Sequence, residues 1–226
     1  MNKILSFLNY FFHIIYLFHK NKIVRYLNKQ KKNIKVVLDV GAYRGKFGNS
    51  FKKSKVFFFE SNPHIFKKIK KKSGRYFNVG IGAKYETKKF YIMPNDSTSS
   101  FKKINYRSRF REKFFNYIGM VIIEKKIKIF PLNYFITKYN IKNIDVLKID
   151  TEGFEEEVLN GINNKNFKKI KYIVIEKLSE KNLYKKYSFK RIQKILIKNN
   201  FFLIKKFKDF LWNYEDLVFK NKNAQE

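Results

Sequence analysis

The sequence has no cysteine, which excludes a disulfide scaffold, zinc sites built from thiolates and a cysteine nucleophile. It is also poor in acidic residues, because 18 aspartates and glutamates stand against 51 lysines and arginines, for a formal net charge of +33. Internal repeats and long flexible linkers are absent too. What remains can fold, since 44% of the residues are hydrophobic and 19% are aromatic. The 226 residues suffice for one domain with a sizeable core.

The positive charge has two interpretations. A strongly basic surface predicts attraction to nucleic acid or to an anionic membrane. However, lysine supplies 44 of the 51 basic residues, whereas proteins that read phosphates geometrically favour arginine. The chain is rich in lysine, asparagine, isoleucine, phenylalanine and tyrosine, whose codons are A/T-rich, so a compositional drift of the genome explains the excess without a ligand. In either case we expect nucleic acid to bind only non-specifically, at low salt.

Residues 4–18, ILSFLNYFFHIIYLF, carry no charged side chain when His13 is neutral. The run is shorter than the roughly 20 residues that a spanning helix needs, and its apolar residues recur at helical spacing. It predicts an N-terminal amphipathic helix that either makes a peripheral membrane contact, aided by the basic residues that follow, or packs on the domain or on a second subunit. We assign residues 1–33 to this segment and expect a cytoplasmic protein, with the inner membrane surface as an alternative location.

From residue 34 to residue 220 apolar strands alternate with amphipathic helices. Strands are expected at 33–40, 55–60, 75–82, 88–93, 144–150 and 170–177, helices at 49–54, 62–73, 131–140, 155–162 and 188–200, and a closing antiparallel pair at 201–207 and 216–220. This alternation predicts an α/β fold, a sheet with crossovers and helices on both faces. Residues 221–226 form a polar tail.

The first strand ends in a glycine turn that suits a ligand. In VVLDVGAYRGKFGNSF, residues 36–51, Asp39 is followed by Gly41 and Gly45, and the second strand ends in Glu60, 21 positions after Asp39. Ligands of open α/β sheets bind beyond the carboxyl ends of the strands. Glycines let the backbone approach a ligand closely, and an acid at the end of the second strand suits ribose hydroxyls. These features predict an adenosine-type cofactor, with a purely structural turn as the alternative.

Two common nucleotide motifs do not fit this turn. The dinucleotide fingerprint G-x-G-x-x-G requires a middle glycine, and Tyr43 stands there, which argues against NAD or FAD. The Walker turn G-x-x-x-x-G-K-[ST] requires a Ser or Thr after its lysine, and none follows Lys46.

A second acidic cluster lies in IDVLKIDTEGFEEEVLNG, residues 144–161. Asp150 and Glu152 come at the carboxyl end of a buried strand, and Gly153 turns into a helix. Two carboxylates in a cleft can act as a general base, bind a metal or anchor a hydroxylated substrate. The alternative is capping of the helix N-terminus, which fits residues 155–157 well. It fits Asp150 poorly, because Asp150 precedes the turn.

These segments resemble the FkbM family of S-adenosylmethionine-dependent methyltransferases. The resemblance rests on LDVGAYRGKFG, FFFESNP and LKIDTEGFEEEVLNG, supported by FNVGIG, NDSTSSF and DLVFK, and it covers roughly residues 35–220. It implies a Rossmann-like seven-stranded methyltransferase sheet and methyl transfer to a hydroxyl. Two positions depart from the family pattern: Tyr43 stands where Asn is common, and Leu132-Asn133 stands where Leu-Asp is usual.

The resemblance also implies roles for individual residues. The cofactor S-adenosylmethionine would be bound by a set from the first two strand ends: Asp39, Gly41, Tyr43, Gly45 and Glu60. Asp150 and Glu152 would face the methyl group and the acceptor as catalytic residues, with Asp150 as our first candidate for the general base and His64 as a rival. We predict no metal, because no histidine accompanies the two carboxylates.

We therefore predict an O-methyltransferase that acts on a small-molecule or sugar acceptor, with surface glycan biosynthesis as the expected context. The alternative is a basic nucleic-acid-binding or RNA-modifying protein on a methyltransferase-like fold, based on the lysine run 67–72. Residues 94–120 are the expected acceptor loop. Arg107, Arg109 and Arg111 in that loop indicate either an anionic acceptor or a solvated turn.

Overall fold

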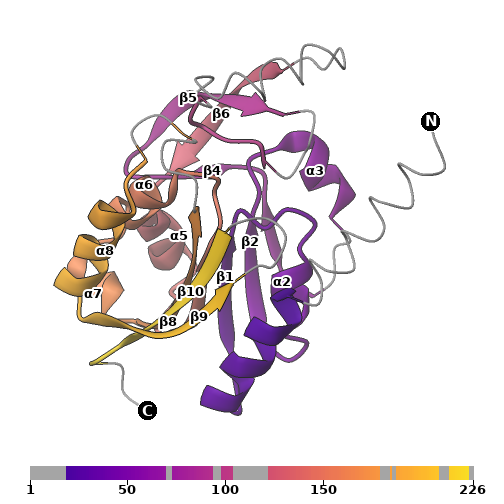
Figure 1. The fold of residues 1–226 in the computed structure, drawn as a ribbon. Coiled ribbons are helices and arrows are strands. Elements are labelled where there is room, and N and C mark those ends of the chain that lie inside the picture. The colour runs from indigo at the N-terminus through magenta and orange to yellow at the C-terminus, as the bar shows by residue number, and fades with distance from the viewer. Residues whose placement is uncertain are drawn as a thin grey trace.

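The structure is a computed structural model of the chain, and it describes residues 19–69, 73–93, 98–103, 122–178, 184, 187–208 and 214–223 (Figure 1). The apolar run 4–18 and most of the 94–120 segment, including its three arginines, lie outside the described residues, so the expectations for them stay predictions. In the part of the chain that the structure describes, no helix combines the length and the apolarity needed to cross a membrane.

A seven-stranded sheet forms the centre of the fold, in the order β3-β2-β1-β7-β8-β10-β9 (Figure 1). Its strands are β1 Val36–Val40, β2 Lys55–Phe59, β3 Arg75–Phe77, β7 Ile144–Ile149, β8 Ile170–Leu178, β9 Phe201–Lys208 and β10 Tyr214–Asn221. Strands β3, β2, β1, β7 and β8 pair in parallel, while β10 runs antiparallel to both β8 and β9. The predicted sheet and its closing antiparallel pair are confirmed.

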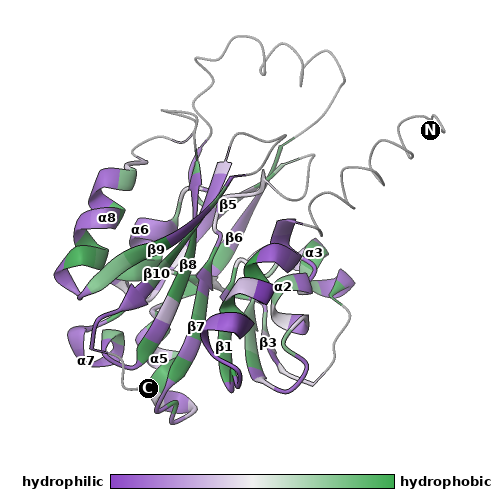
Figure 2. Ribbon diagram, turned by 60° about the horizontal axis from the view of Figure 1, so that its bottom comes forward, coloured by the Kyte–Doolittle hydropathy of each residue, from purple (hydrophilic) through white to green (hydrophobic). Residues whose placement is uncertain are grey.

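Helices cover both faces of this sheet, as predicted. One face packs against α5 Leu132–Lys138, α6 Glu155–Asn160, α7 Asn164–Phe167 and α8 Phe189–Lys198. The other face packs against α2 Lys46–Asn49 and helical residues 19–30. Alternate strand residues serve the two layers, since Leu38 and Val40 face the first and Val37 faces the second. Figure 2 shows the hydrophobic strands between the more polar helices.

The structure corrects the prediction of one strand over residues 75–82. That stretch forms β3 and then β4 Gly80–Ile81, which belongs to a second, three-stranded sheet in the order β4-β6-β5. The other members are β5 Glu86–Ile92 and β6 Ile123–Phe130. Between β3 and β4 the side-chain amide of Asn78 donates to the carbonyl of Glu60 at 2.8 Å, so the chain leaves the first sheet there. β5 lies at an edge, as expected.

Two helices near the glycine turn differ from their predicted bounds. The helix expected at 49–54 is instead α2, because Gly45 adopts a left-handed N-cap conformation and the helix begins one residue later. In α3, Pro63–Lys68, the predicted cap is confirmed, since Asn62 Oδ1 accepts the His64 N–H at 3.0 Å. This helix ends five residues before the predicted residue 73, because Ile69 has extended backbone angles.

Candidate functional site

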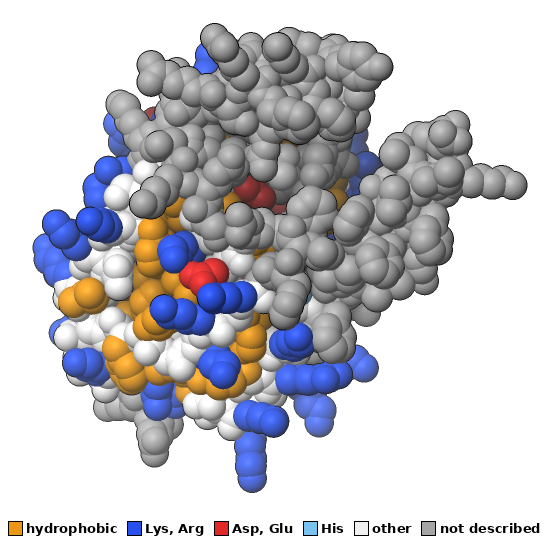
Figure 3. Space-filling view, viewed as in Figure 1, with side chains coloured by type: hydrophobic (Ala, Val, Ile, Leu, Met, Phe, Trp, Pro, Cys, Tyr) orange, Lys and Arg blue, Asp and Glu red, His pale blue; other side chains and the backbone are white. Residues whose placement is uncertain are grey.

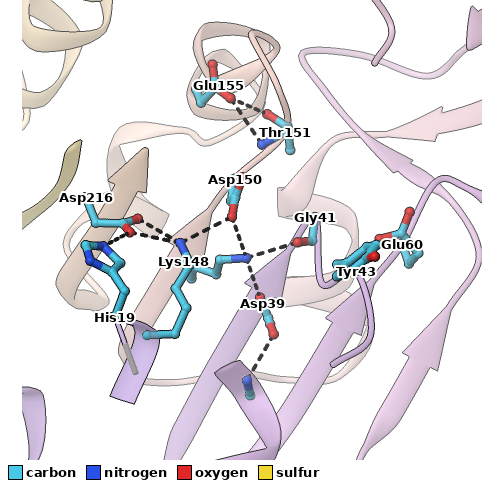
Figure 4. A network of polar contacts seen from close by, with 12 residues as sticks. His19, Asp39, Gly41, Tyr43, Glu60, Lys148, Asp150, Thr151, Glu155 and Asp216 are labelled. Atoms are coloured by element: carbon cyan, nitrogen blue, oxygen red, sulfur yellow. Dashed lines mark hydrogen bonds and ion pairs between the residues drawn. The ribbon is translucent and has the colours of Figure 1, made fainter. Parts of the chain in front are cut away.

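The acidic residues predicted to form a site meet at one edge of the seven-stranded sheet. Because β1, β2 and β7 are parallel neighbours, their carboxyl ends lie together, and this brings Asp39, Glu60 and Asp150 to one place (Figure 4). The ladder between β1 and β7 continues past β7, since the Asp150 N–H donates to the Val40 carbonyl at 3.0 Å. The predicted turn and the predicted acidic cluster therefore form one site.

The glycine turn is built around this strand contact. Gly41 has a φ of 74°, and a Cβ atom added to it would lie only 1.7 Å from the Asp150 carbonyl oxygen. The turn is also held by Asp39, whose Oδ2 accepts the Gly48 N–H of α2 at 3.0 Å. From the sequence we expected Gly41 to let a ligand approach the backbone. In the structure, the backbone that lies close to Gly41 is that of Asp150, after the neighbouring strand β7.

Glu60 is held at the end of β2 by backbone donors. Its Oε2 accepts the Tyr43 N–H and its Oε1 accepts the Asn62 N–H, each at 2.7 Å. Burial raises the pKa of Glu60 to about 7, against the effect of these two hydrogen bonds. Each carboxylate oxygen has a second lone pair, so Glu60 can still accept hydrogen bonds from a ligand.

Lys148 occupies the centre of the site, and the sequence prediction missed it. It lies opposite Asp39 in the ladder between β7 and β1. Its side chain is 2% exposed, and its Nζ lies 3.4 Å from Asp39 Oδ1 and 3.1 Å from Asp150 Oδ2. It also donates to the Gly41 carbonyl at 3.0 Å. One ammonium group thus joins the turn to the acidic cluster.

Asp150 is flanked by two ammonium groups. Besides Lys148, Nζ of Lys20 lies 3.6 Å from the same Oδ2 atom. Burial by itself would raise the pKa of Asp150, but the charges of Lys148 and Lys20 lower it to about 2. Asp150 is therefore a stable carboxylate and a weak base.

Glu152 stands beside Asp150 in a different environment. Its Oε2 accepts the Tyr184 hydroxyl at 3.0 Å, and its carbonyl accepts the Ser100 hydroxyl at 2.6 Å. Its backbone has a φ of 53°, which is rare outside glycine. Burial and the charge of Asp150 raise the pKa of Glu152 to about 8. The two predicted catalytic acids thus differ strongly in basicity.

Two further acids extend the cluster across the sheet. Glu176 of β8 and Asp216 of β10 are cross-strand partners, and they are 6% and 1% exposed. Burial, with the charges of Asp150 and Glu152, raises the pKa of Glu176 well above its usual value. Single carboxylate oxygens of Asp150, Glu152 and Glu176 lie within 4.8 Å of one another, so this group could hold a cation. That the site holds no metal stays a prediction.

The remaining candidates lie outside the cluster or serve the turn. Glu155 Oε1 accepts the N–H groups of Thr151 and Gly153, at 3.1 and 3.0 Å, so it closes the loop before α6 in the way that capping predicts. His64 is exposed, and its Nε2 lies 3.1 Å from Lys125 Nζ of the second sheet. The structure therefore does not bring His64 to Asp150.

The site is a concentration of acidic residues in a basic protein. Lysine and arginine side chains are spread over the face shown in Figure 3, where acidic atoms form small groups. Seven of the 18 acidic residues of the chain nevertheless lie at or just beyond this one edge of the sheet: Asp39, Glu60, Asp150, Glu152, Glu155, Glu176 and Asp216. A ligand that carries positive charge would favour the ionised forms of these acids.

The sheet order and the site at its carboxyl edge define a Rossmann-like methyltransferase fold. The structure resembles that of magnesium protoporphyrin IX methyltransferase (ChlM) from Synechocystis PCC 6803, solved with bound SAM and with bound SAH. For the SAM complex the TM-score is 0.52 at 9% identity, over 92% of this chain and 81% of that one. The 1,6-didemethyltoxoflavin-N1-methyltransferase from Burkholderia thailandensis gives a TM-score of 0.44 at 9% identity, over 90% of this chain and 78% of that one.

The chain belongs to the FkbM methyltransferase family. The family model, described as a methyltransferase FkbM domain, matches residues 39–203, which is more than half of the chain. The matched range begins at Asp39, near the end of β1, and includes Glu60, Asp150 and Glu176. The comparison with curated proteins found no match.

Proposed function

We propose that the protein is an S-adenosylmethionine-dependent O-methyltransferase that acts in the cytoplasm on a hydroxyl group of a small molecule or sugar. The observation that carries this proposal is the junction of the glycine turn and Glu60 with a cluster of buried carboxylates, all at one edge of the sheet. The family and the fold support methyl transfer, and the acidic residues support transfer to a hydroxyl oxygen.

The residues of the turn fit the proposed cofactor. The second lone pairs of the Glu60 oxygens would accept the ribose hydroxyls, and the turn from Gly41 to Gly45 would lie along the ligand. The concentration of acids beyond β7 suits a cation. S-adenosylmethionine, when bound, supplies an electrophilic methyl group on a positively charged sulfur.

Glu152 is the better candidate for the general base, in place of Asp150. A base must accept the proton of the acceptor hydroxyl while the oxygen bonds to the methyl carbon, and such a base contributes about 10²- to 10⁴-fold. A carboxylate whose pKa is about 8 holds that proton far better than one whose pKa is about 2. Asp150, fixed between Lys148 and Lys20, would orient the acceptor or stabilise positive charge.

The acceptor is proposed as a sugar or other hydroxylated small molecule, with surface glycans as the candidate class. The acidic edge disfavours a polyanionic acceptor such as nucleic acid, because phosphates would face buried carboxylates. We therefore assign any nucleic-acid binding to the basic surface outside the site, as a salt-sensitive and non-specific effect.

Calorimetric titration of the purified protein with S-adenosylmethionine and S-adenosylhomocysteine tests the cofactor assignment. We expect micromolar binding of both ligands and none of NADH, at a salt concentration that suppresses non-specific binding. The Glu60→Ala variant should abolish binding, because it removes the ribose acceptor. Glu86→Ala, on β5 of the second sheet, is the matched control and should bind normally.

Circular dichroism must show that the Glu60→Ala protein is folded. If the Glu60→Ala protein is not folded, Glu60→Gln, which keeps the shape of the side chain, replaces it in the titration. A folded wild-type protein that binds neither adenosyl ligand would overturn the proposed function.

A further inference from the structure

The N-terminal helix lies on the sheet face that carries the acidic cluster. Ile23, Val24 and Leu27 of residues 19–30 are buried in the core formed with that face. The strand residues in this core include Val146, Val174 and Val218. Side chains alternate between faces with a period of two, so Lys148 and Asp150 follow Val146 on this face, Glu176 follows Val174, and Asp216 precedes Val218.

The antiparallel strand β10 brings its first residues to the edge where the parallel strands end. Asp216 lies opposite Glu176 in the ladder with β8, one strand further from β7 than Glu176 itself. Asp150, Glu176 and Asp216 thus occupy corresponding places on three neighbouring strands. Three carboxylates side by side in a buried layer repel one another unless cations or protons separate them.

The N-terminal helix places a cation, the ammonium group of Lys20, beside Asp150 and Asp216. Lys20 is 3% exposed, and its Nζ donates to Asp216 Oδ2 at 2.9 Å and to Oδ1 at 3.1 Å. The same Nζ lies 3.6 Å from Asp150 Oδ2. His19 adds a further contact, since its Nε2 lies 2.9 Å from Asp216 Oδ2 (Figure 4). The first described turn of the helix therefore reaches β10 and β7 together.

We propose that the N-terminal helix is part of the active site and that Lys20 is a positioning residue, which links Asp150, the residue after β7, to Asp216 of β10. The proposal rests on the proposed function, because that function places Asp150 at the acceptor. Both carboxylate oxygens of Asp216 accept hydrogen bonds from the ammonium group of Lys20, and these bonds hold Lys20 in place. Lys20 in turn holds Asp150 through the ion pair with its Oδ2 atom. Lys148 fixes the other side, from within β7.

This arrangement explains how neighbouring carboxyl groups can differ in charge. Asp150 stays ionised between two lysines, whereas Glu152 accepts a hydrogen bond from the neutral hydroxyl of Tyr184. A neutral residue at position 20 would remove one of the two charges that hold Asp150. The charged groups that act on Asp150 come from every neighbouring element: Lys20 from the helix, Asp39 from β1, Lys148 from β7, Glu152 from the loop after β7, Glu155 from α6, Glu176 from β8 and Asp216 from β10. His19 of the helix contacts Asp216.

Carboxyl ¹³C NMR can observe the effect of Lys20 on Asp150 directly. The chain has only six aspartates, so labelling of the full-length protein with [4-¹³C]aspartate gives a simple spectrum, and Asp150→Asn identifies the Asp150 resonance. At neutral pH we expect Lys20→Met to move this resonance by more than its linewidth. Lys20→Arg keeps the charge and should restore most of the shift, whereas Lys29→Met, an exposed lysine of the same helix, should leave it unchanged.

A second measurement, the affinity for S-adenosylhomocysteine, tests whether the contact between Lys20 and Asp150 affects cofactor binding. S-adenosylhomocysteine is titrated first into the wild-type protein, where binding should also move the Asp150 resonance. We then expect Lys20→Met to weaken that binding on the order of threefold to tenfold, because a looser supporting residue leaves Asp150 misplaced. Lys29→Met should bind as the wild type does.

The outcomes separate the two proposals. If the wild type binds no adenosyl ligand, the proposed function fails, while the effect of Lys20 on the Asp150 resonance is still measured. If the ligand binds and Lys20→Met leaves both the resonance and the affinity unchanged, Lys20 is not a positioning residue. If Lys20→Met does not fold, Asp216→Asn removes the grip on Lys20 instead, and an unmoved Asp150 resonance in that variant overturns the proposal.

Discussion

Glu60 follows β2 and Asp150 follows β7 at the same edge of the sheet, and different groups stabilise their negative charges. Glu60 is buried, and the side chain of Asp150 is 15% exposed. Glu60 receives two backbone N–H groups, and its pKa is raised to about 7. Asp150 lies beside the ammonium groups of two lysines, and its pKa is lowered to about 2. Two amide dipoles do not offset the cost of burying a negative charge here, whereas two full positive charges do.

The difference divides the site by chemistry. The turn region holds a carboxyl group that can exchange its proton near neutral pH and accept hydrogen bonds from a ligand. The acidic cluster holds one fixed carboxylate, Asp150, next to Glu152, whose pKa is raised to about 8. A methyl transfer that releases a proton needs both a fixed negative charge and a group that takes up the proton.

The largest expected effect comes from removing the lysine that joins the two regions. Lys148→Met leaves the carboxylates of Asp39 and Asp150 in the interior with one cation fewer. Removing one partner of a buried ion pair costs about 3–5 kcal/mol, because the other charge is left uncompensated. We expect the free energy of unfolding, measured by urea denaturation at pH 7, to fall by about that amount.

Lys205→Met on the edge strand β9 is the matched control for this loss. Lys205 is exposed, so the change should alter the unfolding free energy by less than about 0.5 kcal/mol. A Lys148→Met protein as stable as the control would mean that the carboxyl groups of the cluster are neutralised by protons and not by lysine.

The fold was predictable because its signals are local. Segments such as VVLDV and KVFFF consist mainly of apolar residues and therefore predict buried strands, and Asn62-Pro63 predicts the start of a helix. The second sheet was harder to predict. Residues 75–82, RYFNVGIG, suggest a single short strand, and only the pairing partners of β3 and β4 reveal two sheets.

The site was predictable only where its acidic residues lie at the ends of strands. Asp39, Glu60 and Asp150 have that signature. Lys148 lies inside a strand of a chain with 51 basic residues, so nothing local distinguishes it from a solvated lysine. Asp216 and Lys20 meet across 196 positions of sequence, through an antiparallel strand and a helix whose packing the sequence does not specify. The period-two pattern of β8, with Glu176 on the face of Val174, is the one signal that could have pointed to the row of acids.

An intermediate effect is expected from pH. Burial raises the pKa of Glu152 from its usual value of 4.5 to about 8 in the folded protein. The protonated form thus stabilises the fold fully below pH 4.5, and this contribution is lost as the pH rises through 8. One pKa unit corresponds to about 1.4 kcal/mol. Because Glu152 titrates together with its neighbours, we expect the loss between pH 5 and 9 to be on the order of 1–3 kcal/mol.

Glu152→Gln isolates that contribution. The amide cannot ionise, so the variant should lose less stability than the wild type between pH 5 and 9, when both are followed by urea denaturation. The slope that remains should come from the other carboxyl groups whose pKa values burial raises: Glu60 and Glu155, each to about 7, and Glu176. Glu86→Gln on the second sheet should track the wild type. Identical slopes for wild type and Glu152→Gln would show that Glu152 is ionised already at neutral pH.

The smallest expected effect concerns the backbone of the turn itself. Tyr43 has a φ of 50°, a conformation that asparagine tolerates and tyrosine does not favour, while its N–H holds Glu60. Tyr43→Asn keeps that N–H and relieves the strain, so it should stabilise the protein by about 0.5–1 kcal/mol in urea denaturation. Asn200, with a φ of 65°, offers the reverse exchange, and Asn200→Tyr should destabilise by a similar amount. If Tyr43→Asn instead destabilises the protein or weakens S-adenosylhomocysteine binding, the ring of Tyr43 contributes contacts that outweigh the strain, and the turn region is held by side chains as the acidic cluster is.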